Sequence, residues 1–170
     1  HRLFVVDVDN MRINVYEHSG EFLYTFGQDG IRTGEFNAPH GLTMDANEDL
    51  FVIGYYGPTQ KFTAKGEFLF DFAHADPPDN PVYFHSISSV RWGNIYLMVR
   101  GQRGYGGALE DQEGNRVSVM KYNNNGDVVG SITLKVKEHK ENWAVVDKDG
   151  LVYALYESQE KRGVQIFAPR

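Results

Sequence analysis

The segment from Leu3 to Val52 reads LFVVDVDNMRINVYEHSGEFLYTFGQDGIRTGEFNAPHGLTMDANEDLFV. It contains three extended stretches rich in Val, Ile, Tyr and Phe, and each is closed by Gly, Asn or Asp, as is typical of short β-strands. A crossing punctuated by glycine follows, and the pattern then begins again with a second Leu-Phe-Val. This stretch predicts one unit of a repeat built from antiparallel β-strands.

An aromatic residue followed four positions later by glycine marks the repeat, in the pairs Tyr16/Gly20, Phe62/Gly66 and Tyr122/Gly126. The strands that precede the aromatic positions begin at Leu3, Leu50, Ile95 and Leu151, at spacings of 47, 45 and 56 residues. Self-similarity at a period of about 40 to 50 residues is the signature of propeller blades. The long third interval implies about ten extra residues in one loop.

The first repeat also resembles the consensus of the NHL-repeat family. The matching residues are Asp7, Asn10, Arg12, Ile13, Tyr16, Gly20, Phe22, Phe26, Gly27, Gly34, Phe36, Pro39, Gly41 and Asp45. Members of this family are β-propellers, commonly six-bladed, so the resemblance implies an all-β fold of four-stranded antiparallel blades. It covers the whole chain as a period but only residues 3–52 as a motif. Gly54 stands at the Asp7 position, and the second and third repeats have no Arg at the Arg12 position.

We therefore expect four blade repeats, at about 1–38, 39–82, 83–140 and 141–170, as part of a six-bladed propeller. Alternation and bounding turn residues predict strands over 3–8, 12–17, 22–26, 41–45, 50–55, 59–63, 67–72, 86–91, 94–100, 116–122, 127–134, 143–147, 151–156 and 163–168. The first repeat lacks an inner strand and the last lacks an outer one. Since propellers protect their edges by radial closure, we expect additional chain, or alternatively a partner, to supply the missing blades.

Composition excludes several function classes. The 23 acidic and 17 basic residues give a net charge of −6, which argues against a general nucleic-acid binder, because neutralising phosphates needs clustered Lys and Arg. No apolar run approaches the roughly 18 residues of a membrane span. The absence of cysteine excludes disulfides, thiolate metal sites and thiol catalysis. The chain begins in mid-strand without an initiating Met; we read it as a processed or partly observed segment and expect a periplasmic or extracellular location.

Unusual connections gather at one end of the predicted blades, because successive connections of antiparallel strands alternate between two ends. One end carries short hairpins, and the other carries Tyr55, Tyr56 and the insertion 101–115. Arg103 and Tyr105 of the insertion are candidate anchors for a protein partner, since both residue types are enriched at interface hot spots; the alternative is a flexible surface loop. Trp92, in a hairpin turn, is a further candidate contact. The periodic aromatics are instead expected to pack blade against blade.

Two histidines form the candidate metal site. His40 and His85 lie at the start of successive predicted inner strands, although they fall one residue out of step when aligned from the strand that follows. Neutral imidazoles there could bind zinc or act as acid and base, and a metal-dependent lyase that cleaves peptidyl-hydroxyglycine uses this repeat fold with histidine ligands facing its channel. The alternative is that both are hydrogen-bonded loop histidines.

The aspartates are weaker candidates for a metal site than the histidines. The segment Asp7-Val-Asp9-Asn10 suggests calcium only superficially, because no Gly and distal Glu follow at loop spacing. The family resemblance instead implies that Asp7 pairs with Arg12 at the ends of two strands. Asp45 and Asp147 close inner strands before tight turns, where hydrogen bonding of the Asx type accounts for them.

The favoured function is therefore a non-catalytic protein-binding or scaffold module in a larger assembly, without a cofactor. The alternative is a metal-dependent lyase or hydrolase with a histidine site at the channel mouth, for which zinc or calcium would be the metal. RNA recognition, known for some animal members of the family, conflicts with the mixed charges of the loops.

Overall fold

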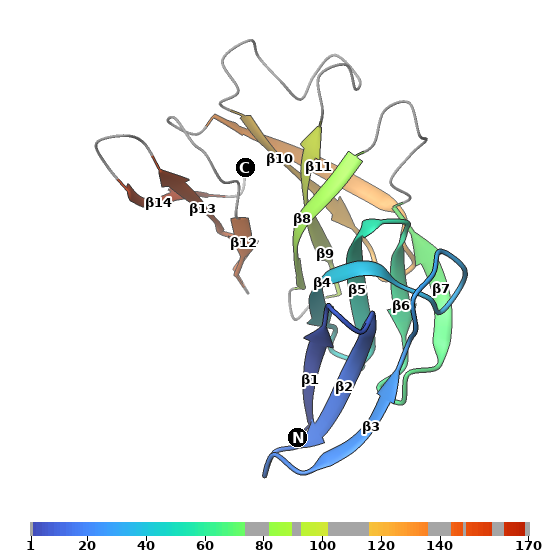
Figure 1. Cartoon of the computed structure of the whole chain (residues 1–170). Coiled ribbons are helices and arrows are strands. Elements are labelled where there is room, and N and C mark those ends of the chain that lie inside the picture. The colour runs from blue at the N-terminus through green and yellow to red at the C-terminus, as the bar shows by residue number, and fades with distance from the viewer. Residues whose placement is uncertain are drawn as a thin grey trace. The chain divides into compact units, whose positions relative to one another are not determined.

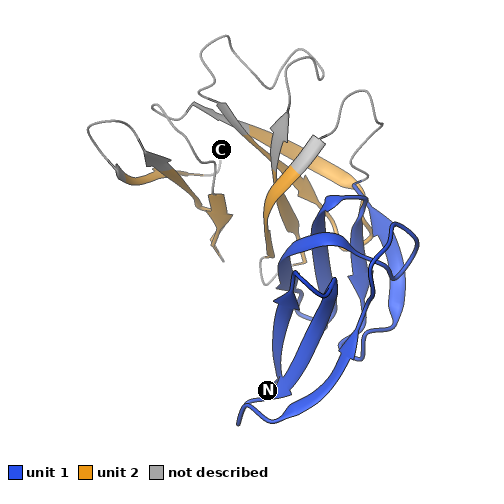
Figure 2. Cartoon of the chain, viewed as in Figure 1, with its two compact units in different colours: residues 1–74 blue, residues 75–170 orange. Residues whose placement is uncertain are grey.

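A computed structural model of the chain describes residues 2–73, 82–89, 93–101, 116–135, 144–147, 149–157 and 162–168. These residues form fourteen β-strands in four antiparallel sheets and no helix (Figure 1). The strands divide between two compact units, residues 1–74 and 75–170 (Figure 2). The all-β prediction is confirmed, and within each unit every sheet follows the order of the sequence.

The first unit contains two sheets. Strands β1 (Arg2–Asp7), β2 (Arg12–Glu17) and β3 (Phe22–Phe26) form one in the order β1-β2-β3. The other has the order β4-β5-β6-β7, with β4 (Asn37–Met44), β5 (Leu50–Tyr56), β6 (Thr59–Phe62) and β7 (Phe68–Phe72).

The second unit also contains one four-stranded and one three-stranded sheet. Its four-stranded sheet has the order β11-β10-β9-β8, from β8 (Val82–Ser89), β9 (Ile95–Gly101), β10 (Arg116–Tyr122) and β11 (Val128–Lys135). Its three-stranded sheet comprises β12 (Ala144–Val146), β13 (Val152–Glu157) and β14 (Arg162–Phe167) in that order. All fourteen predicted strands are present. The inner strands β4 and β8 begin four residues earlier than predicted.

The aromatic-to-glycine marker occupies the same local structure three times. In the turn after Tyr16, Glu17 N donates to Glu21 O at 2.8 Å and Gly20 N donates to Glu17 O at 2.9 Å. The turns Thr63–Glu67 and Asn123–Asp127 repeat both bonds. Their glycines, Gly20, Gly66 and Gly126, have φ of 90°, 84° and 83°, a region that favours glycine. In each ladder the register shifts at the marker aromatic itself.

The core of the first unit lies between its two sheets. Ile13 of β2, Leu50 and Val52 of β5, and Phe62 of β6 are fully or almost fully buried there, together with Phe36. The rings of Phe26, Phe36 and Phe68 surround Phe62 at centroid distances of 5.3, 5.5 and 5.9 Å. Aromatic pairs in these tilted and edge-on arrangements add to the stabilisation from burial.

The core of the second unit joins its own two sheets in the same way. Buried side chains of β9 and β10 meet buried side chains of β12 and β13, namely Tyr96, Met98, Val119, Ala144, Val146, Val152 and Ala154. Ser86 Oγ of β8 also donates to Ala144 O at 2.6 Å. Packing of sheet on sheet through alternate side chains therefore holds each unit together.

Candidate functional site

Three connections and His40, in the first half of β4, lie at one end of the first unit. They are the turn 8–11, the crossing segment 27–36, the end of β5 with Gly57 and Pro58, and His40; we call this set the loop end. Two contacts tie it together: Ala38 N donates to Met11 Sδ at 3.2 Å, and the rings of His40 and Tyr55 lie 4.8 Å apart. These contacts join the turn 8–11 and the end of β5 to β4.

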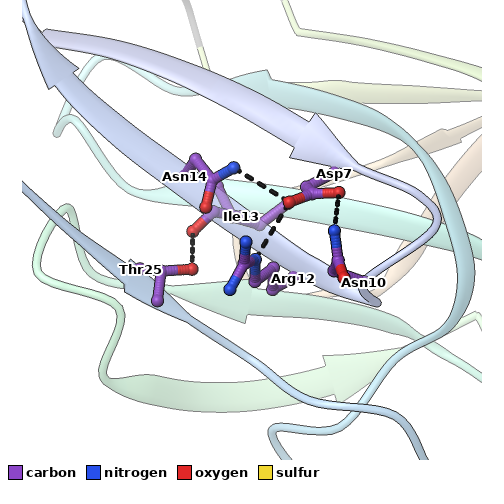
Figure 3. A network of polar contacts seen from close by, with 6 residues as sticks. All are labelled: Asp7, Asn10, Arg12, Ile13, Asn14 and Thr25. Carbon is purple, nitrogen blue, oxygen red and sulfur yellow. Dashed lines mark hydrogen bonds and ion pairs between the residues drawn. The ribbon is translucent and has the colours of Figure 1, made fainter. Parts of the chain in front are cut away.

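The turn 8–11 is fixed by the carboxylate of Asp7 (Figure 3). Asp7 accepts hydrogen bonds from Asn10 Nδ2 at 2.8 Å, Arg12 Nε at 2.9 Å and Asn14 Nδ2 at 3.0 Å. The hydrogen bond from Asn10 and then that from Arg12 lower the pKa of Asp7 from its ordinary value. The contact between Asp7 and Arg12 implied by the family resemblance is present, and the carboxylate has a structural role in holding β1 to β2.

The crossing segment is anchored by the buried side chain of Gln60. Gln60 Oε1 accepts from Gly34 N at 2.8 Å, and Gln60 Nε2 donates to Glu35 O at 2.6 Å. Within the segment, the Glu35 carboxylate accepts from Arg32 N at 3.0 Å and from Gln28 Nε2 at 3.1 Å. The bond from the Arg32 backbone is the main reason that the pKa of Glu35 is lowered, so this carboxylate stays ionised.

Ile31 stands at the tip of this anchored segment and is 76% exposed, the largest fraction among the exposed large hydrophobic side chains of the described residues. The neighbouring Arg32 and Thr33 are exposed as well. Ile31 was not among the contact residues predicted from the sequence. The available signal was a bulky aliphatic residue between Gly30 and Gly34 in an otherwise polar loop.

Tyr55 and Tyr56, predicted as contact residues, end β5 and are both exposed. Tyr55 lies against the imidazole of His40 at an interplanar angle of 44°. Gly54 allows the two strands to approach here, because a Cβ at this position would lie 2.6 Å from Asn37 O. The two exposed tyrosines therefore lie where β5 ends beside β4.

The histidine prediction needs correction in two respects. His40 and His85 lie inside β4 and β8, not at their starts, because both strands begin earlier than predicted. They are also in step: each stands at the register shift of its ladder, between Pro39 and Gly41 in β4 and between Phe84 and Ser86 in β8. Both ladders end four residues later, at the pairs Met44/Leu50 and Ser89/Ile95.

His40 belongs to the first unit and His85 to the second. The His40 side chain lies with Nδ1 3.3 Å from Ala38 O, and both imidazoles are half-buried. Among the residues that the structure describes, no group of three or more His, Cys, Asp or Glu side chains is arranged to hold a metal ion. Each histidine therefore occupies the same bulge position of its own sheet.

The remaining predicted contact residues, Arg103, Tyr105 and Trp92, lie outside the described residues, as does the insertion from 102 to 115. Over the described parts of the chain, no helix is both long and apolar enough to cross a membrane.

Comparison with solved structures shows what the fold of the chain is similar to. No family model matches the chain. No curated protein matches it either. Among solved structures, the chain is similar to a member of the DUF4221 family from Bacteroides vulgatus, with 9% sequence identity and a TM-score of 0.48, over 98% of this chain and 75% of that chain.

Proposed function

We propose that the chain is part of an NHL-type β-propeller, with its four sheets as blades, and that it acts as a non-catalytic protein-binding or scaffold module in a larger, extracytoplasmic assembly. The recurrence of one turn, one bulge and one aromatic position in three sheets supports the repeat. The binding surface of this proposal is the loop end of the first unit.

The exposed position of Ile31 is the observation that carries the binding proposal. Hydrogen bonds from Gln60 and Glu35 hold the crossing segment in place while its tip leaves an aliphatic side chain in water. Burying such a side chain is worth about 1.5–3 kcal/mol. Because the segment is already ordered, a partner that covers Ile31 would lose little of this gain to conformational entropy.

Other exposed residues of the loop end favour a protein partner. Tyr55, Tyr56 and Arg32 belong to the residue types most enriched at interface hot spots. Charges of both signs, such as Asp29 and Arg32, accompany them, a mixture that suits protein recognition better than the uniformly basic surface needed for nucleic acid.

Affinity purification from the source cells, quantified by mass spectrometry, tests this proposal. A variant with Ile31→Ser and Tyr56→Ser should recover the partner of the wild-type protein at a level reduced about tenfold or more. Val128→Ser, at a comparably exposed position on β11, is the matched control and should recover it fully. Equal recovery with the double variant and the wild type would contradict the proposal.

The shared bulge position of His40 and His85 favours a second candidate, a metal-dependent lyase or hydrolase that uses these histidines. Neutral imidazole is the usual nitrogen ligand of zinc and can also act as a general base. Elemental analysis of the purified protein should then show bound zinc or calcium, and His40→Ala and His85→Ala should each remove it. Metal-free protein that binds neither ion on titration would dismiss this candidate.

A further inference from the structure

Two residues of the loop end that are not glycine have left-handed backbone conformations, and they contact each other. Met11, in the turn 8–11, has a φ of 52°, and Ala38, in β4, has a φ of 48°. This region is unfavourable for residues with a Cβ, and backbone strain of this kind clusters at binding sites and switches. The contact is the hydrogen bond that Ala38 N donates to Met11 Sδ at 3.2 Å. A single sulfur atom thus joins the turn to β4 at a strained point.

Further contacts connect this hydrogen bond to Tyr55, one of the predicted contact residues. Ala38 O lies 3.3 Å from His40 Nδ1. The ring of His40 lies 4.8 Å from the ring of Tyr55, which is exposed near the end of β5. Met11 Sδ is therefore the first member of a series of contacts that ends at the proposed binding surface.

The thioether of Met11 is accessible to a small oxidant. Its side chain is half-buried, and the three residues before it, 8–10, are exposed. Met98 is only 1% exposed, whereas Met44 and Met120 are half-buried within paired strands. Peroxides convert methionine to its sulfoxide, which changes a flexible apolar side chain into a polar one.

The present contact has no room for a sulfoxide. An N–H···O hydrogen bond spans about 2.9 Å between nitrogen and oxygen alone. An oxygen atom therefore cannot be inserted between Met11 Sδ and Ala38 N while these atoms stay 3.2 Å apart. Met11 also packs against the buried cluster that contains Ile13 and Phe36, where a polar side chain is disfavoured. Both effects would displace the oxidised side chain.

We propose that Met11 is a modification site: hydrogen peroxide oxidises it to methionine sulfoxide, and this loosens the loop end and weakens partner binding. The effect on binding rests on the proposed function. In the reaction, the Met11 sulfur attacks one peroxide oxygen, the O–O bond breaks as the S–O bond forms, and water is released. Sulfur loses two electrons, which reduce the peroxide.

Loss of the hydrogen bond to Met11 explains how the change would reach the binding surface. Ala38 and Met11 can then relax from their left-handed conformations, and Ala38 O moves away from His40. Tyr55 loses the support of the His40 ring as a result. Methionine sulfoxide reductases restore the thioether, so the site acts as a reversible switch.

Mass spectrometry and amide hydrogen exchange on the full chain, before and after treatment with hydrogen peroxide, test the proposal. The peptide that contains Met11 should gain one oxygen atom. The amide of Ala38, which the sulfur binds in the reduced chain, should exchange about tenfold faster or more. Recovery of the partner by affinity purification should fall about tenfold. Methionine sulfoxide reductases with dithiothreitol should reverse all three changes.

Two leucine variants separate Met11 from the other methionines. Met11→Leu keeps an apolar side chain of similar size against the core but has no sulfur. Its exchange rate at Ala38 should not respond to peroxide. Met44→Leu removes another half-buried methionine that packs against the same core, and this variant should respond as the wild type does.

Three results would overturn the proposal. The first is that Met11 stays reduced in folded protein exposed to peroxide. The second is unchanged exchange at Ala38 after Met11 is oxidised. The third is an equal response to peroxide in Met11→Leu and the wild type.

The effect on binding has its own test. Unchanged partner recovery after complete oxidation of Met11, together with loss of the partner from the variant with Ile31→Ser and Tyr56→Ser, would overturn the switch and leave the proposed function intact. If that double variant also keeps the partner, the proposed function fails.

Discussion

Gln60 binds Gly34 across the first unit: the buried side-chain oxygen of Gln60 accepts the backbone hydrogen of Gly34 at 2.8 Å. The same side chain donates to Glu35 O at 2.6 Å, so one amide group satisfies two backbone groups of the crossing segment. This relationship links the regular strand β6 to the exposed tip at Ile31.

Replacing Gln60 should therefore loosen the crossing segment. Gln60→Ala leaves Gly34 N and Glu35 O without this partner, and we expect a loss of about 1–3 kcal/mol in the free energy of unfolding. Urea denaturation measures the loss, and faster amide hydrogen exchange at residues 30–36 locates it. Gln28→Ala, which removes only the exposed bond to Glu35, is the control and should cost less than about 0.5 kcal/mol.

Phe62 should be much more sensitive than Phe22, although both are aromatics of the repeat. Phe62 is buried at the centre of three ring contacts, so Phe62→Ala should cost about 3–5 kcal/mol. Phe22 is exposed, and Phe22→Ala should cost under about 1.5 kcal/mol, mainly from the edge-on contact with Tyr16. Chemical denaturation of both variants measures these losses in the free energy of unfolding. Equal losses would contradict the placement of Phe62 in the core and of Phe22 at the surface.

Lys61 holds a buried ionic cluster in the second sheet. Its Nζ lies 3.2 Å from Asp45 Oδ2 and 3.0 Å from Asp49 Oδ2, and it also lies over the ring of Phe51 at 5.0 Å. Lys61→Met leaves the buried Asp45 carboxylate without its ion-pair partner, so we expect a loss of about 3–5 kcal/mol in the free energy of unfolding. Adding Asp45→Asn should restore part of it. The coupling would be contradicted if the double variant lost at least as much free energy of unfolding as Lys61→Met and Asp45→Asn lose together.

The Asp7 network should make stability depend on pH in the acid range. The pKa of Asp7 is lowered in the folded chain, so its contribution is complete above the ordinary value of 3.8 and is lost as the pH falls through the lowered folded value. The difference in melting temperature between wild type and Asp7→Asn should be largest near pH 6 and should vanish at the acid end. Asp9→Asn, in the same turn, is the control and should melt close to the wild type near pH 6, because Asp9 accepts none of the three hydrogen bonds of Asp7.

Much of the fold could be predicted because each hairpin carries its own local signal. Gly20, Gly66 and Gly126 follow an aromatic at fixed spacing, and the structure places all three in identical turns. Asp45 and Asp147 behave as expected, since each Oδ1 accepts two backbone hydrogens of the turn that follows. These features depend only on residues close in sequence.

The sequence-based predictions were wrong or incomplete where contacts between residues far apart in the sequence determine the structure. Pro39 and Gly41 read as a strand boundary, yet β4 continues through them because a bulge at His40 accommodates both, and β4 lies at the edge of its sheet, where Pro is tolerated. Ile31 was missed because only the bonds from Gln60, nearly thirty residues away, show that its loop is ordered. The arrangement of the four sheets as blades stays a prediction.

Pulsed electron resonance between spin labels tests that arrangement most directly. The chain has no cysteine, so Ser19→Cys, Lys65→Cys and Asn125→Cys can be labelled in pairs at the same exposed turn position of three sheets. Blades set around one axis in a six-bladed propeller predict equal distances for 19–65 and 65–125, and a distance for 19–125 longer by a factor of roughly 1.7. Unequal neighbouring distances, or a factor near 2 as in a straight stack, would contradict the propeller.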